Sequence, residues 1–209
     1  MEFLERTYPW RFAIGVTFFL VLGLQDWIRH REDPKRAKEY LFLLYAALVA
    51  IIYGVIHDEV TCTISREYFI YGKQLDFDPP PFRVAVAILA TRASYGVGLV
   101  AGALLLIANN PSPTRPRLGY RELMRLALLP LALAAIGAVV GGALYSFDAF
   151  HLQARALELV PEQYVARFLV VWGVHTGSYA GAALGAIVSI VLVWLRRRAR
   201  TAQSGDRMT

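Results

Sequence analysis

The chain has 209 residues, of which 56% are hydrophobic and 18% charged, and it carries a formal charge of +6. The mean hydropathy of +0.43 excludes an ordinary water-soluble domain and predicts an integral membrane protein. The cations lie in short segments beside apolar runs, which is typical of membrane topology and speaks against nucleic acid as a partner. Cys62 is the only cysteine, which excludes an internal disulfide and a cysteine-based metal cage.

The first predicted helix spans residues 10–28. Trp10 and Trp27 bracket its apolar run and are typical of interfacial anchors. The small residues of a signal-peptide cleavage site are missing, because Gln25 and Asp26 follow the run, so we interpret the segment as an uncleaved helix. The run is short, and a helix that lies in the membrane interface is the alternative.

Four further apolar runs are long enough to cross a hydrocarbon core of about 30 Å. They predict helices at 38–57, 82–108, 121–147 and 164–196, with a kink at Pro130. We therefore expect an all-α integral membrane protein, a bundle of about five transmembrane helices, or four if the first is interfacial. These helices form a single domain over residues 1–198, and a disordered cytoplasmic tail follows at 199–209.

Lysine and arginine concentrate in three segments, at 29–38, at 109–122 and in the tail after Leu195. The loops between them carry mostly acidic side chains. Because cytoplasmic loops are enriched in Lys and Arg, this distribution predicts that the three segments face the cytoplasm. We expect a multi-pass protein of the cell (inner) membrane, surrounded by membrane lipids, with its C-terminus in the cytoplasm.

The outer loop after the second predicted helix has a strand-like pattern. Apolar and hydroxyl side chains alternate from residue 60 to residue 65, and the β-prone run 68–71 follows. The alternation predicts a small β-hairpin at 60–72 on the outer face. Since a two-stranded ribbon is marginally stable alone, we expect it to rest on the helix ends.

The last predicted helix carries a glycine at every fourth position, the pattern of a glycine zipper: Gly173, Gly177, Gly181 and Gly185. Such a stripe lets another helix backbone approach closely. Natural partners with the same spacing are Gly98 and Gly102 in the third helix and Gly137 and Gly141 in the fourth. The stripe serves either internal packing or contact between subunits of a homo-oligomer.

Ionisable residues at membrane depth are candidates for function, because each costs about 2.5–3.5 kcal/mol on insertion scales. Counting about 20 residues outward along the helices brings His57, Asp58, Arg92 and His175 to one level near the outer face. Four neighbours complete this candidate polar cluster: Glu59, Glu67, Tyr95 and Tyr179.

Two histidines and a carboxylate are ligands for a transition metal such as zinc or iron, and the candidate metal ligands are His57, His175 and Asp58. Two histidines at equal depth could instead ligate a haem between helices. A third interpretation is structural: Arg92 pairs with Asp58 or Glu59, and His57 caps the second helix. No H-E-x-x-H pair, nucleophile elbow or glycine-rich phosphate loop accompanies these residues, so the sequence assigns no catalytic residue.

Three motifs carry a resemblance to a known family. Residues 53–61 read Y-G-x-x-H-D-x-x-T, residues 65–69 read S-x-E-Y-F, and residues 175–179 read H-x-x-S-Y. In these motifs the chain resembles an uncharacterised bacterial family of small multi-pass membrane proteins with no established activity. The resemblance covers most of residues 40–198, and it implies that the first helix is an addition. It draws attention to His57, Asp58, Glu67, His175 and Tyr179 and supplies no substrate.

Two functions are consistent with the sequence. The first is a non-enzymatic accessory or assembly subunit of a membrane complex, whose outer face contacts a membrane protein partner. It follows from the small-residue packing faces and the lack of a catalytic motif. The alternative is an outer-face metal- or haem-binding membrane protein with redox or hydrolytic chemistry, based on the ionisable residues at one depth. Whether the protein is an enzyme stays open on these grounds.

Overall fold

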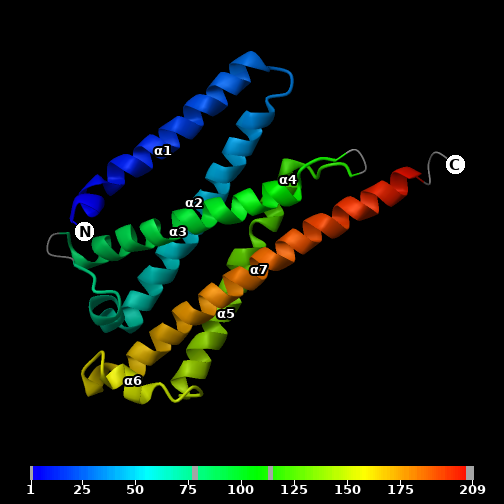
Figure 1. Cartoon of the computed structure of the whole chain (residues 1–209). Coiled ribbons are helices and arrows are strands. Elements are labelled where there is room, and N and C mark those ends of the chain that lie inside the picture. Colours follow the sequence, from blue (N-terminus) through cyan, green and yellow to red (C-terminus); the bar gives the residue numbers. More distant parts are fainter. Residues whose placement is uncertain (1, 77–79, 113–114, 206–209) are drawn as a thin grey trace.

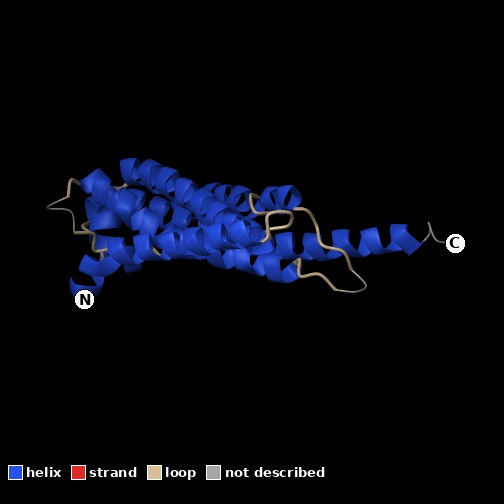
Figure 2. Cartoon of the chain, turned by 90° about the horizontal axis from the view of Figure 1, so that it is seen from above, coloured by secondary structure: helices blue, strands red, loops and turns tan. Residues whose placement is uncertain are grey.

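A computed structural model describes residues 2–76, 80–112 and 115–205, and within these ranges the regular structure is helical. Five long helices run through the molecule (Figures 1 and 2): α1 (Glu2–Arg29), α2 (Lys35–Ile64), α3 (Phe82–Ala108), α5 (Leu129–Ser146) and α7 (Val165–Gly205). Four short elements connect them: η1 (Tyr68–Gly72), α4 (Tyr120–Leu126), α6 (Gln153–Leu157) and η2 (Glu162–Tyr164). The predicted all-α class is confirmed.

Four of the described helical segments are long and apolar enough to cross a membrane: Lys35–Ile64, Phe82–Ala108, Tyr120–Ser146 and Glu162–Thr201. The first helix α1, which the sequence predicts as a fifth span, is not among them. It packs along α2, on the side away from α5 and α7 (Figure 1). Asp26 near its end accepts a hydrogen bond from the backbone N–H of Ala37 at 3.0 Å, which fixes the turn between the two helices.

Four of the five long helices form two tight pairs, α5 with α7 and α2 with α3. In the first pair the glycines face each other: a methyl group at Gly177 would overlap the carbonyl oxygen of Gly137, and one at Gly185 would lie 2.5 Å from the Cα of Pro130. In the second pair, a methyl group at Gly98 would lie 2.6 Å from the carbonyl oxygen of Ala46. Gly98 and Gly102 of α3 therefore pack against α2, whereas the glycines of α5 pack against α7.

The predicted β-hairpin at 60–72 is wrong. Residues 60–64 continue α2, and Tyr68–Gly72 form one turn of π-helix. The hydroxyls of Thr61 and Thr63 donate to backbone carbonyls three residues earlier, at 3.2 and 2.6 Å. These local bonds satisfy the polar side chains inside the helix, so the alternation that resembles a strand imposes no sheet pairing.

The boundaries of two other elements differ from expectation. The helix predicted at 121–147 is interrupted after Leu126, where α4 ends. Pro130 occupies the first turn of the new helix α5, where its missing N–H costs no hydrogen bond. At the other end of the chain, α7 continues to Gly205, so its described part extends into the tail predicted to be disordered from residue 199. Arg196 and Arg200 both contact the carboxylate of Glu122, at 3.1 and 2.6 Å, which holds this extension against α4.

Arg197 locks the connection between α3 and α4. Its side chain is 5% exposed and donates hydrogen bonds to the backbone carbonyls of Ala108, Asn110, Arg115 and Pro116, at 2.5 to 3.2 Å. A guanidinium presents its donors in a planar fork, which suits several acceptors at once. This arginine therefore has a structural role besides any contribution to topology.

Candidate metal centre

The candidate centre lies between α2 and α7, at the end of the bundle opposite Arg197. His57 and Asp58 come from α2, about two turns before its end, and His175 comes from α7. One potential ligand atom of each of the three side chains lies within 4.8 Å of the other two. The imidazole rings of His57 and His175 meet edge to face with centroids 4.7 Å apart, and Asp58 Oδ1 lies 3.8 Å from His175 Nε2.

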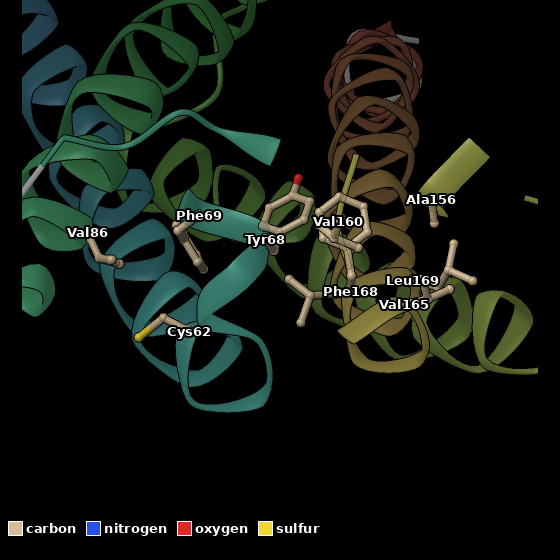
Figure 3. Close-up of a cluster of buried hydrophobic side chains, with 10 residues drawn as sticks. Cys62, Tyr68, Phe69, Val86, Ala156, Val160, Val165, Phe168 and Leu169 are labelled. Atoms are coloured by element: carbon tan, nitrogen blue, oxygen red, sulfur yellow. The ribbon is translucent and has the colours of Figure 1, made fainter. Parts of the chain in front are cut away.

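Aromatic rings surround the two imidazoles. Tyr53 stacks on His57 with centroids 5.5 Å apart, and Tyr68 stacks on His175 at 4.6 Å. Phe69, which is fully buried, lies 5.9 Å from His175. Figure 3 shows Tyr68 pointing from η1 toward α7, where it faces Phe168. The π-helical turn η1 therefore acts as a lid that separates the centre from the end of the bundle.

The Tyr68 ring that covers His175 is uncharged. Burial raises the pKa of the Tyr68 phenol well above its usual value, and the nearby Tyr179 adds to this effect. Tyr68 therefore stays protonated across the physiological pH range. Its ring serves as cover for His175, and its phenol does not add a negative charge to the centre.

Two hydrogen bonds cross the interface between α2 and α7 beside the centre. The hydroxyl of Thr61 lies 3.3 Å from His175 Nε2, and the hydroxyls of Tyr53 and Ser178 are 2.9 Å apart. The buried Nε2 of His57 has no hydrogen-bond partner within the described ranges. Because a buried polar nitrogen without a partner is costly, this atom is available to a ligand.

The donor set fits a transition metal. Two histidines and one carboxylate ligate zinc in open sites that keep one position for water or substrate, and the same set ligates non-haem iron(II). Two atoms that each lie about 2 Å from an ion can be at most about 4 Å apart, so small inward rotations of the side chains would complete the site. These residues could hold the ion without any movement of the helices.

The predicted carboxylates Glu59 and Glu67 have other partners. Arg83 donates a hydrogen bond to Glu59 at 2.7 Å, on the side of α2 that faces α3. Glu67 accepts a hydrogen bond from Ser65 at 3.1 Å and lies 3.9 Å from Arg167. Asp58 is therefore the only one of the three predicted carboxylates in the cluster with the histidines.

Three further predicted residues lie around the centre or on α3. Tyr179 follows His175 by one turn, with ring centroids 6.2 Å apart, and its side chain is exposed. Arg92 and Tyr95 are half-buried on α3. Of the residues predicted at one level, His57, Asp58 and His175 therefore form the cluster between α2 and α7, and Arg92 lies on α3.

Sequence reasoning missed Tyr53, Thr61 and Tyr68 as parts of the site. Tyr53, His57 and Thr61 follow one another at intervals of four, so they share one face of a helix, and this spacing was available in the sequence. Because the predicted helix ended at residue 57, Thr61 was assigned to the predicted hairpin and not to the face that carries His57. Tyr68 stands in the S-x-E-Y-F motif, but its position above His175 depends on the fold of η1, which no spacing in the sequence predicts.

The chain matches no protein-family model, and no curated protein or solved structure is detectably similar to it.

Proposed function

We propose that this chain is a multi-pass membrane protein that binds a zinc or iron ion between His57, Asp58 and His175, inside the membrane-spanning bundle and beneath an outer-face lid. The observation that carries the proposal is the convergence of two imidazoles and a carboxylate within 4.8 Å of one another, with Asp58 and His175 buried and His57 half-buried. Burying such groups costs free energy unless they are paired or coordinate a metal. A bound ion provides that compensation.

Exposed apolar side chains on the outside of the bundle support the membrane setting. Ile107 on α3 and Val139 on α5 are 70% and 73% exposed, and many other large aliphatic residues are exposed in the same way. Water-soluble monomers rarely present so much continuous apolar surface. The cationic segments meet at the end of the bundle that holds Arg197, which supports a cytoplasmic C-terminus and places the proposed ion toward the outer side.

The ring geometry favours a single ion over haem. The imidazoles of His57 and His175 are in direct edge-to-face contact, with centroids 4.7 Å apart. A haem held by two histidines places the flat macrocycle between them. The contact leaves no space for it.

The motif residues also support the proposal. The hydrogen bond between Tyr53 and Ser178 and the stacking of Tyr68 on His175 join residues of all three motifs around one centre. We also propose that the chain is related to the uncharacterised family of small multi-pass membrane proteins that it resembles. The family would then share the metal site at the junction between α2 and the lid η1. The function as an accessory or assembly subunit stays a prediction and is compatible with a bound metal.

Titration with Co²⁺ tests the proposal, because cobalt reports its ligand field through visible absorption. The purified protein should bind one equivalent, and the bands should disappear in His57→Ala and His175→Ala. His151→Ala is the matched control, since this histidine is exposed in the loop before α6, and it should keep the spectrum. Unchanged spectra in both site variants, or no binding in the wild type, would overturn the proposal.

A further inference from the structure

An apolar groove of about 630 Å³ lies between the two helix pairs. Its volume falls within the range of about 300–1,000 Å³ typical of ligand clefts. The paired helices α2, α3, α5 and α7 all contribute to its walls, and many of the lining side chains are small. Representative lining residues are Ala46, Ala50, Gly96, Val97, Ala183 and Ala186.

The groove leads toward the metal centre. Tyr179 lines the groove, and its ring lies 6.2 Å from that of His175. On α7, His175, Tyr179 and Ala183 follow at intervals of four and share one face. On α2, Ala50 in the groove precedes His57 by two turns. The apolar groove and the polar centre are therefore consecutive parts of one surface between α2 and α7.

Positive charge gathers where the groove and the centre meet. The ammonium group of Lys73 lies 5.5 Å from the ring centroid of Tyr68 and 5.9 Å from that of Tyr179. A divalent ion held by two neutral histidines and Asp58 keeps a net positive charge and an open coordination position. An anionic oxygen would complement both the ion and the lysine.

We propose that the groove binds the hydrocarbon chain of a fatty acid, whose carboxylate reaches the metal centre beside Lys73. This inference rests on the proposed function, because the ion supplies most of the positive charge. A groove of this size accommodates a ligand with one chain, whereas a diacyl lipid would have to leave its second chain in the bilayer. The alanines and glycines that α2, α3 and α7 contribute to its walls explain why the groove stays open.

Photocrosslinking in nanodiscs loaded with Zn²⁺ tests the inference, with palmitic acid that carries a diazirine at its terminal carbon as the probe. The label should map to the groove faces of α3 and α7. Gly96 lines the groove, and a methyl group there meets no atom within 4 Å, so Gly96→Leu adds its bulk where the groove wall is open. Labelling should fall about tenfold or more, since the added side chain displaces buried methylenes of the ligand.

Gly15→Leu is the matched control. Gly15 also has open space around it, but it lies on α1, outside the groove, so labelling should not change. Lys73→Gln should weaken labelling by palmitate several-fold and leave labelling by the corresponding diazirine alcohol unchanged, because only the acid is charged at its head.

Bound Zn²⁺ is measured in the same samples, so that the two proposals can fail separately. If Gly96→Leu retains Zn²⁺ but labels as strongly as the wild type, or if the label spreads evenly over α1 and the other outward faces, the groove inference is refuted and the metal site stands. If the wild type binds no Zn²⁺, both proposals are refuted.

Discussion

The contact between α5 and α7 makes a sharp prediction for Gly177→Ala. A methyl group there would overlap the carbonyl oxygen of Gly137 and lie 3.0 Å from the Cα of Gly141. These are backbone atoms and cannot rotate away, so the helices must separate. Overpacking costs about 3 kcal/mol at the upper end of its usual range, and the better helix propensity of alanine offsets about 1 kcal/mol of this. We expect a net loss of about 2 kcal/mol in the free energy of unfolding, or roughly a thirtyfold rise in the unfolded fraction.

Cys62 provides the assay. It is the only cysteine of the chain and is 5% exposed, so a maleimide reagent should label it mainly after unfolding. Gly177→Ala should label about thirtyfold faster than the wild type in mild detergent, by the same estimate. Gly96→Ala is the matched control, because its methyl group meets open space and should stabilise the helix by up to about 1 kcal/mol. Equal labelling rates for both variants would refute the close packing of α5 on α7.

Two further predictions concern the lid and Arg197. Tyr68→Ala should lower the affinity for metal about tenfold by removing the ring that orients His175, whereas Tyr68→Phe should keep it; metal titration distinguishes the two. Arg197→Met should speed hydrogen exchange at the Leu118 amide about a hundredfold, because loss of its charged hydrogen bonds frees the loop at a cost of about 3 kcal/mol. An unchanged exchange rate would show that Asn109 holds Leu118 without Arg197.

The long apolar helices could be predicted because their signal is local. Runs of about 20 apolar residues leave few alternatives to helix, since the backbone must satisfy its own hydrogen bonds in a bilayer. The segment 60–72 has no such long apolar run, and the hairpin predicted there was wrong. The alternating Thr61 and Thr63 are compatible with strand or helix, and the choice depends on continuity with α2, which a short window does not detect.

The candidate site was partly within reach of the sequence. Counting residues from the helix ends predicts that His57 and His175 lie at similar depth, but depth does not say which helix faces which. The two rings meet because the pairing of α2 with α3 and of α5 with α7 turns both histidines toward each other. Glu59 lies next to Asp58 in sequence yet faces Arg83, since adjacent positions on a helix point about 100° apart.

Metal content is the most direct test of the central claim. The protein, purified in detergent without chelator, is analysed by mass spectrometry for metals, beside a His57→Ala/His175→Ala double variant and the His151→Ala control. We predict one zinc or iron ion per chain in the wild type and in the control, and none in the double variant. A wild-type protein that folds, keeps Cys62 protected and contains no metal, even after incubation with Zn²⁺ or Fe²⁺, would contradict the claim.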